Sequence, residues 1–196
     1  MNLHEKYGKI RIPHEWRGTD KFTTLITTFF GTGMSPKAPG TMGSLATTIV
    51  AYPIALLANS LLGEYESIAI GSNDFAIFVS LPFLITAIFV FFAALPFVDK
   101  AMKDTGSEDP GWIVIDEVCG IFTALAFVPS VVIIDCPWVL LFAFGLFRFF
   151  DIFKPFGIHQ IEKLPGAWGV MADDLLGGLY AGILMGLGLT AYLTVF

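Results

Sequence analysis

Hydrophobic residues in this chain form long stretches separated by short polar segments. The strongest stretches cover residues 41–62, 75–97 and 175–196, and weaker ones cover 113–134 and 137–153. About 20 apolar residues in a helix cross the roughly 30 Å hydrocarbon core of a bilayer. The pattern therefore predicts an all-α fold, a polytopic membrane helical bundle with about five transmembrane or partly re-entrant helices.

The two weaker stretches are separated only by residues 135–137, Asp-Cys-Pro, which is typical of a tight helical hairpin. Asp116 and Glu117 stand near the start of the first stretch, and Arg148 and Asp151 near the end of the second. Because a hairpin returns its two ends to the same side, these four side chains are expected at one membrane surface.

A shorter amphipathic pattern occupies residues 20–30. Apolar residues recur there at helical spacing and threonines take the opposite face: Phe22, Leu25, Ile26, Phe29 and Phe30 against Thr23, Thr24, Thr27 and Thr28. Asp20 is a candidate N-cap and Gly31 a candidate stop. The segment is too short to span, so it is expected to lie in the cytoplasmic interface or to pack on the bundle. Residues 1–19 form a polar N-terminal tail, and 20–196 are expected to form a single membrane-embedded domain.

The composition agrees with a bilayer environment. Of 196 residues, 55% are hydrophobic and 14% are charged, and a soluble core of this size could not bury so much apolar surface. The net charge of −6 disfavours a nucleic-acid partner. Cys119 and Cys136 fit no zinc motif or disulfide framework. The expected partner is the lipid bilayer, and the sequence does not identify a protein partner.

Lysines and arginines indicate how the chain is oriented. All eleven lie before residue 41, in 98–112 or in 148–174, and the loops expected on the opposite side contain none. Cytoplasmic loops carry such a positive excess. The N-terminus is therefore expected inside and, with five spans, the C-terminus outside.

Three polar segments on the cytoplasmic side could carry chemistry, and the first is GTGMSPKAPGTMGS at 31–44. Its glycines permit close approach of the backbone, and Ser35, Lys37 and Thr41 supply two hydroxyls and a cation. Such a segment suits a phosphate, but it is not a P-loop, and segments rich in glycine and proline are more often simple turns.

The second and third segments each place two adjacent acids near a helix start: Asp116 with Glu117, and Asp173 with Asp174. Glycine follows at i+4, and Gly120 is expected to clear space over Asp116. Acids at a helix start can merely complement its dipole. Adjacent carboxylates beside hydrocarbon repel one another and are costly to desolvate, however, so a cation should compensate them.

The third segment also spaces Arg148, Asp151 and Lys154 at i, i+3 and i+6. One interpretation is an exposed salt-bridge ladder of little energetic value. The other is that Asp151 helps to hold a metal while Arg148 and Lys154 contact phosphate oxygens. His159 and Glu162 are further candidates, although a lone histidine in a loop is more often a surface residue.

Paired carboxylates without a rich set of histidines and cysteines favour Mg²⁺ over Zn²⁺. Magnesium usually bridges to a substrate phosphate, so the expected chemistry is phosphoryl transfer or hydrolysis on a membrane phospholipid. No Cys-x₅-Arg loop or Asp-x-Asp motif is present. A cation-coupled transporter is the rival class, but transporters usually place ion sites near the bilayer midplane.

Taken together, the three segments resemble the phosphatidylglycerophosphatase A family. The matching motifs are GTGMSPKAPGTMGSLA at 31–46, PGWIVIDEVCG at 110–120 and FRFFDIFKPFGIHQIEKLPGAWGVMADDLLGG at 147–178. The resemblance implies a Mg²⁺-dependent enzyme of the bacterial inner membrane that converts phosphatidylglycerophosphate to phosphatidylglycerol. Ala167 departs from the family pattern, where a second glycine is expected.

The resemblance and the residues together give one mechanistic hypothesis. The catalytic residues are Asp116, Asp151, Asp173 and Asp174; these acids and Glu117 are the expected Mg²⁺ ligands; Lys37, Arg148 and Lys154, with Ser35 and Thr41, are expected to bind the substrate. Attack by water and an aspartyl-phosphate intermediate both stay open, as do other lipid phosphates such as phosphatidate or undecaprenyl phosphate.

Overall fold

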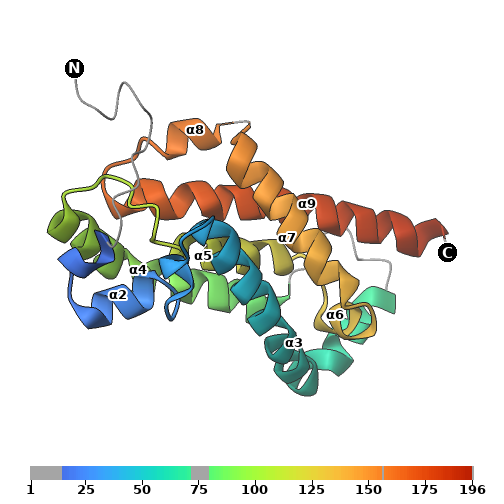
Figure 1. The fold of residues 1–196 in the computed structure, drawn as a ribbon. Coiled ribbons are helices and arrows are strands. Elements are labelled where there is room, and N and C mark those ends of the chain that lie inside the picture. Colours follow the sequence, from blue (N-terminus) through green and yellow to red (C-terminus); the bar gives the residue numbers. More distant parts are fainter. Residues whose placement is uncertain (1–14, 72–79, 156, 196) are drawn as a thin grey trace.

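A computed structural model describes residues 15–71, 80–155 and 157–195 (Figure 1). Its elements are η1 (Glu15–Gly18), α2 (Lys21–Thr27), η2 (Thr32–Met34), α3 (Pro39–Gly71), α4 (Leu81–Thr105), α5 (Ile115–Leu125), α6 (Ser130–Asp135), α7 (Trp138–Phe153), α8 (Ile158–Ile161) and α9 (Ala167–Val195). All regular structure within these residues is helical, which confirms the all-α prediction.

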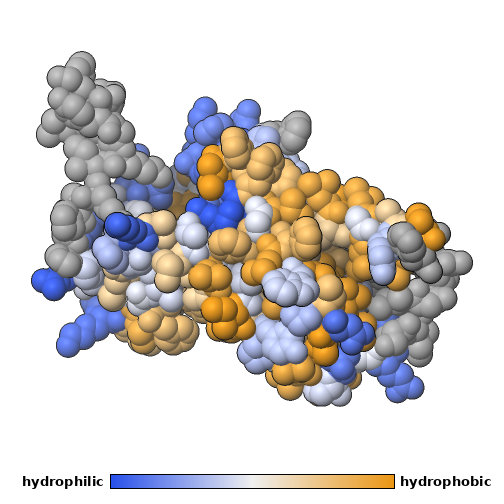
Figure 2. All heavy atoms as spheres, turned by 45° about the vertical axis from the view of Figure 1, so that its right-hand side comes forward, coloured by the Kyte–Doolittle hydropathy of each residue, from blue (hydrophilic) through white to orange (hydrophobic). Residues whose placement is uncertain are grey.

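Three helices are long and apolar enough to cross a membrane. The qualifying segments are Pro39–Glu66 of α3, Leu81–Thr105 of α4 and Ala167–Leu193 of α9. They correspond to the three strong apolar stretches, although residues 72–79, which include the expected start of the second, lie outside the described residues. Figure 2 shows a broad hydrophobic surface over the helices, with strongly hydrophilic residues at its edges and in one central patch.

The last long helix begins earlier than expected. Gly166 has a left-handed φ of 61° and directly precedes α9, which starts at Ala167. Asp173 and Asp174 therefore lie in the second turn of the helix and do not open it. The helix dipole stabilises acids mainly in the first turn, so it does not account for two acids in the second turn.

The expectation of one continuous helix over 113–134 is wrong. α5 ends at Leu125 after eleven residues, or about 16 Å, and α6 begins only at Ser130. Pro129, which has no N–H to donate, is the N-cap of α6 and helps to separate the two helices. α7 has sixteen residues, or about 24 Å, against a hydrocarbon core of about 30 Å. The count of five full spans stays a prediction.

The short helix α5 is the centre of the bundle. Every residue of α5 except Asp116 is buried, and the helix packs against α3, α4, α7 and α9. Its contact with α9 depends on glycine: a Cβ atom added at Gly178 would lie 2.2 Å from the Gly120 carbonyl oxygen. The two backbones therefore touch directly, and this close packing brings the acids of α5 beside those of α9.

The N-terminal helix α2 is shorter than its sequence pattern. Asp20 caps it as expected, accepting hydrogen bonds of 3.0 Å from the Phe22 and Thr23 amides. The hydrogen bonds from Thr23 hold the pKa of Asp20 at about 2. Gly31 is not the stop, because α2 ends at Thr27 and the chain has already turned with positive φ at Phe29 and Phe30.

Part of the predicted polar tail is folded. η1 packs against α4, and the Thr19 hydroxyl donates a 2.6 Å hydrogen bond to Asp104 Oδ2. The earlier residues of the tail, 1–14, lie outside the described part of the chain.

A buried carboxyl group joins three helices at the bundle end where α3, α4 and α6 meet. Glu66 of α3 is 2% exposed and accepts hydrogen bonds from Ser80 Oγ at 3.0 Å and from the Ser130 amide at 2.7 Å. The Ser130 hydroxyl donates to the same Glu66 oxygen as the amide. Ser80 is the N-cap of α4 and Ser130 is the first residue of α6, so one side chain ties two helix starts to α3.

Candidate active site

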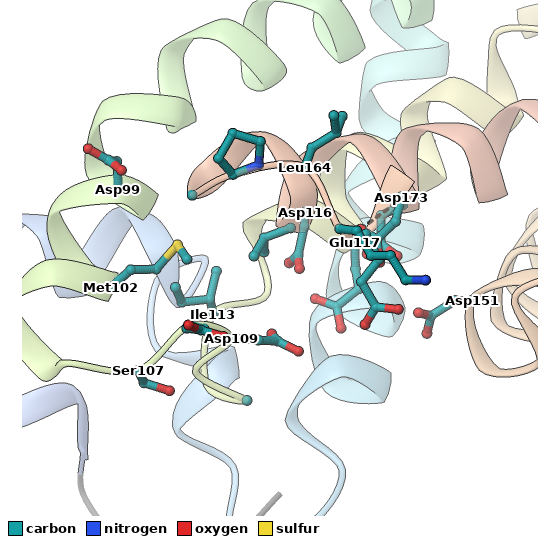
Figure 3. A pocket seen from close by; sticks show the side chains of 18 of the residues that line it. Asp99, Met102, Ser107, Asp109, Ile113, Asp116, Glu117, Asp151, Leu164 and Asp173 are labelled. Atoms are coloured by element: carbon teal, nitrogen blue, oxygen red, sulfur yellow. Dashed lines mark hydrogen bonds between the residues drawn. The ribbon is translucent and has the colours of Figure 1, made fainter. Parts of the chain in front are cut away.

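A cavity of about 890 Å³, lined largely by charged residues, lies where α4, α5, α7 and α9 approach one another. Its charged lining comprises nine acids and three lysines: Asp99, Glu108, Asp109, Asp116, Glu117, Asp151, Glu162, Asp173 and Asp174, with Lys103, Lys154 and Lys163. Figure 3 shows Asp116, Glu117 and Asp173 gathered on one side, and Asp99, Met102, Ser107 and Asp109 on the other. An anionic substrate could enter so acidic a cavity only with cations to compensate the charge.

Three carboxylates form the most concentrated group in this cavity. Asp116 and Glu117 in the first turn of α5 and Asp174 in α9 each offer one oxygen, and these oxygens lie within 4.8 Å of one another. Glu117 is 7% exposed and Asp174 is 4% exposed. Burial weakens the screening by water, so the mutual repulsion of these carboxylates is strong.

The carboxylate group leaves two buried oxygens unsatisfied. Asp116 Oδ1 and Glu117 Oε2 are buried without a hydrogen-bond partner. A buried polar atom without a partner is costly, and a bound cation would satisfy both atoms and reduce the repulsion. Carboxylate oxygens are the donors that hard divalent cations take. The residues present therefore fit a divalent cation held by Asp116, Glu117 and Asp174.

The neighbouring acid, Asp173, has a different partner. Lys154 Nζ lies 2.6 Å from Asp173 Oδ2 and 3.1 Å from Glu162 Oε1. Lys154 ends α7 in a left-handed conformation, with φ 43°, and its side chain reaches α9. Burial alone would lower the pKa of Lys154, but its hydrogen bonds to Asp173 and Glu162 and their charges raise the pKa above the ordinary lysine value. This lysine is therefore a fixed positive charge in the cavity wall.

A second cation, Arg148, bridges α7 and α5. Its Nη1 atom lies 2.6 Å from Asp151 Oδ2 and 3.7 Å from Glu117 Oε1. The predicted ladder of Arg148, Asp151 and Lys154 is thus divided, because Arg148 pairs with Asp151 within α7 while Lys154 turns to α9. Arg148 is 17% exposed, so this is not the solvated surface ladder considered from the sequence.

The glycine-rich segment 31–44 reaches the site through its backbone. A Cβ atom at Gly40 would lie 2.1 Å from Glu117 Oε1, so the start of α3 touches the carboxylate group. Ser35, Lys37 and Thr41 are not among the described residues that line the cavity, and the Ser35 hydroxyl donates 2.8 Å to the Lys37 carbonyl. Their contact with a substrate stays a prediction.

The glycines that follow the acids serve packing. A Cβ atom at Gly120 would meet the Phe147 ring at 2.2 Å and the Asp174 carbonyl oxygen at 2.9 Å. The expectation that Gly120 clears space over Asp116 for a ligand is therefore wrong, since protein atoms already fill that space.

Several residues that line or border the cavity were weak candidates, or none, from the sequence alone. Glu162, only a reserve candidate, contacts Lys154, and His159 Nδ1 lies 3.3 Å from Glu162 Oε2 while its ring stays exposed. Asp99 and Lys103 on α4 form the opposite wall. The i, i+4 spacing of Asp99 and Lys103 signals only a surface ion pair, and nothing local in the sequence places them near α9.

The fold and the site define a class: a helical protein with membrane-length helices and an acidic cavity, with a partly buried lysine in its wall and a partly buried arginine at its border. Comparison with known proteins gives the family. The family model of phosphatidylglycerophosphatase A matches residues 25–189. The chain belongs to the phosphatidylglycerophosphatase A family, and it is a phosphatase. This leaves the transporter alternative without support.

Three relatives are similar to the chain over most of its length. Phosphatidylglycerophosphatase A of Haemophilus influenzae is 41% identical over 162 residues, which cover 82% of this chain and 85% of the relative. A Bacteroides thetaiotaomicron protein named provisionally as a phosphatidylinositol-3-phosphatase is 35% identical, covering 82% of this chain and 89% of the relative. Phosphatidylglycerophosphatase A of Escherichia coli is 33% identical, covering 84% and 82%. No solved structure matches the chain.

Proposed function

We propose that this chain is a Mg²⁺-dependent lipid phosphatase that hydrolyses phosphatidylglycerophosphate to phosphatidylglycerol and phosphate. The observation that carries the proposal is the group formed by Asp116, Glu117 and Asp174, with its two unsatisfied buried oxygens, in a chain of this family. The reaction would be the phosphatidylglycerol-forming step of phospholipid synthesis.

The residues of the site take distinct roles in this proposal. Asp116, Glu117 and Asp174 would hold Mg²⁺, which would supply polarisation of the phosphate and activation of a water molecule. Lys154 and Arg148 stabilise the negative charge that develops on the phosphate oxygens. The raised pKa of Lys154 keeps it protonated, so it acts as a fixed charge and not as the proton donor to the leaving group.

The remaining acids orient the two cations. Asp173 and Glu162 hold Lys154 Nζ from two sides, and Asp151 holds Arg148. Asp151 and Asp173 thus support the charges that face the phosphate, whereas the sequence had assigned them to the metal. We favour direct attack by water; labelled phosphate trapped on the protein would identify the aspartyl-phosphate route.

We place the site on the cytoplasmic face of a bacterial inner membrane. Lys103, Lys154 and Lys163 line the cavity and Arg148 borders it, so the basic residues gather at the site end of the bundle. Cytoplasmic ends of membrane helices carry such an excess. Access of amine-reactive reagents to Lys163 from one side of sealed, oriented membrane vesicles would test the orientation.

A second lipid substrate is supported by one comparison. The Bacteroides thetaiotaomicron relative is named for a different lipid phosphomonoester. The same site could accept any phosphomonoester on a lipid headgroup, such as phosphatidate, undecaprenyl phosphate or phosphatidylinositol 3-phosphate, because its charges address the phosphate and not the group beyond it.

The test is phosphate release by purified protein in detergent from phosphatidylglycerophosphate, with the alternative lipids alongside. We expect the highest kcat/KM with phosphatidylglycerophosphate, activity lost in EDTA and restored by Mg²⁺. Asp174→Asn tests the proposed Mg²⁺ ligands in the same assay. Asp99→Asn, on the opposite wall of the same cavity, is its matched control. Release that ignores EDTA would remove the metal from the proposal, and preference for another lipid would replace the substrate.

A further inference from the structure

The exposed side of α2 and of the turn that follows it is apolar. Phe22 is 61% exposed, Leu25 44% and Phe30 77%. The threonine face is the buried one, with Thr23, Thr24, Thr27 and Thr28 turned inward while α2 packs against α4. An amphipathic helix on a water-facing surface buries its apolar face, so this orientation is reversed.

The inward threonines are satisfied without contact with water. The Thr23 hydroxyl donates to Asp20 Oδ2 at 2.7 Å, Thr27 to the Thr23 carbonyl at 2.8 Å and Thr28 to the Thr24 carbonyl at 2.6 Å. Burial of these hydroxyls therefore leaves no unpaired donor. The outward face gains nothing from water, and its three large side chains are suited to hydrocarbon.

The apolar face of α2 continues that of a membrane-length helix. The Phe22 ring packs edge-on against Phe97 of α4 with 5.6 Å between ring centroids. Further along α4, Phe89 and Phe92 are exposed, as expected of a lipid-facing surface. At the other edge, Lys100 of α4 lies 3.4 Å from Asp20. α2 thus sits where α4 changes from apolar to charged, which is the level of the membrane interface.

The backbone of α2 is also joined directly to the site. Val114 lies two residues before Asp116, and its amide donates a 2.9 Å hydrogen bond to the Thr27 carbonyl. Just beyond α2, a Cβ atom at Gly33 would lie 2.1 Å from the Trp112 carbonyl oxygen. The segment before α5 therefore cannot change its depth without moving α2.

We propose that Phe22, Leu25 and Phe30 insert into the headgroup and acyl boundary of the bilayer, so that α2 is an interfacial anchor that sets the depth of the catalytic cavity. The apolar face of α2 therefore binds the lipid surface itself. The consequence for turnover rests on the proposed lipid phosphatase function, because only a lipid phosphate has a fixed depth in the membrane. The insertion itself does not depend on that function.

The first experiment measures depth. In a Cys136→Ser background, which leaves only the buried Cys119, Phe30→Cys and Arg17→Cys are each labelled with an environment-sensitive fluorophore and reconstituted into phosphatidylcholine and phosphatidylglycerol vesicles. Brominated acyl chains are expected to quench the label at position 30 and to leave the label at position 17 nearly unchanged. Equal quenching at the two positions, or disulfide crosslinking of Phe30→Cys to a second copy, would overturn the proposal.

The second experiment measures the coupling to turnover. Phe22→Ser/Leu25→Ser/Phe30→Ser is compared with Phe22→Leu/Phe30→Leu, which keeps the apolar face. We expect the serine variant to lose on the order of tenfold in phosphate release from lipid in vesicles, since a small misplacement of reacting groups is costly, and to match wild type on a short-chain soluble analogue in detergent. The leucine variant should match wild type in both media.

The two proposals fail in different ways. If wild type releases phosphate from vesicles and the serine variant does so equally well, the anchor is overturned and the phosphatase function stands. If wild type releases no phosphate in either medium while position 30 is quenched by brominated chains, the insertion stands and the proposed function falls.

Discussion

Two buried glutamates in this protein have opposite surroundings. Glu66, where α3, α4 and α6 meet, accepts hydrogen bonds at both carboxyl oxygens from neutral groups on two other helices. Glu117, in the cavity, has one oxygen without any partner and shares its space with Asp116 and Asp174. Burial is nearly the same, at 2% and 7% exposed.

The difference teaches how to separate a structural carboxyl group from a functional one. Donors placed around Glu66 match its acceptors, so the group is complete within the protein and fastens helices. Glu117 is surrounded by other carboxylates, and the nearest positive charge is the Arg148 guanidinium at 3.7 Å. Its charge and hydrogen-bonding capacity are therefore satisfied only when a further ligand binds. Substitutions at the two places should therefore have opposite effects on activity and on stability.

The largest effect is expected at the cavity. Asp174→Asn removes one proposed Mg²⁺ ligand, and we expect kcat to fall by roughly 10³-fold, about 4 kcal/mol in activation free energy. The melting temperature measured without Mg²⁺ should not fall, because the change removes one of several repelling carboxylates. Initial rates at saturating Mg²⁺ and thermal unfolding in detergent measure both. A variant with wild-type kcat would contradict the assignment of the site.

The next effect concerns the cation between Asp173 and Glu162. Lys154→Met should lower kcat by roughly 10²-fold because it removes a preorganised charge and leaves Asp173 without its 2.6 Å partner. Lys103→Met is the matched control, since Lys103 also lines the cavity but pairs with Asp99 through a side chain that is 74% exposed. Equal rates in the two variants would show that position in the cavity, and not the pairing with Asp173, decides the effect.

The long helices could be predicted from the sequence, and the acids could be chosen as candidates, because both depend on local signals. Apolar length fixes α3, α4 and α9, and an acid pair beside hydrocarbon is costly wherever it lies, so Asp116 and Asp174 could be chosen without a fold. The break between α5 and α6 was missed because the stretch is apolar on both sides of Pro129. Length and hydropathy cannot distinguish a buried broken helix from a lipid-facing span.

The different partners of two adjacent acids could not be predicted, because they depend on tertiary contacts. Asp173 and Asp174 are equivalent in the sequence, yet Asp173 meets Lys154 and Asp174 joins the carboxylate group because side chains one residue apart on a helix point about 100° apart. Glu66 was overlooked for the same reason. Its partners, Ser80 and Ser130, are 14 and 64 residues away, and no local spacing connects them.

The third effect tests the structural glutamate. Glu66→Ala leaves the Ser130 amide and hydroxyl without an acceptor, so we expect a loss of about 2 kcal/mol in stability with kcat within about twofold of wild type once folded. Glu66→Gln should lose less, because one amide oxygen can still accept from the Ser130 amide and the amide group can donate to the Ser80 hydroxyl. Unfolding temperature and kcat of the purified variants give the answer. A large loss of kcat without a loss of stability would mean that Glu66 belongs to the catalytic machinery.

The smallest effect is the most specific, because it asks which carboxyl group is incomplete without an added ligand. Mg²⁺ at ten times its Kd should stabilise wild type by about 1.4 kcal/mol, since a ligand that binds only the folded state shifts unfolding by mass action. Glu66→Gln should show the same shift from a lower starting temperature, because its hydrogen bonds lie away from the cavity. Asp174→Asn should lose most of the shift. Equal shifts in all three proteins would locate Mg²⁺ outside the group of Asp116, Glu117 and Asp174 and would remove the distinction between the two glutamates.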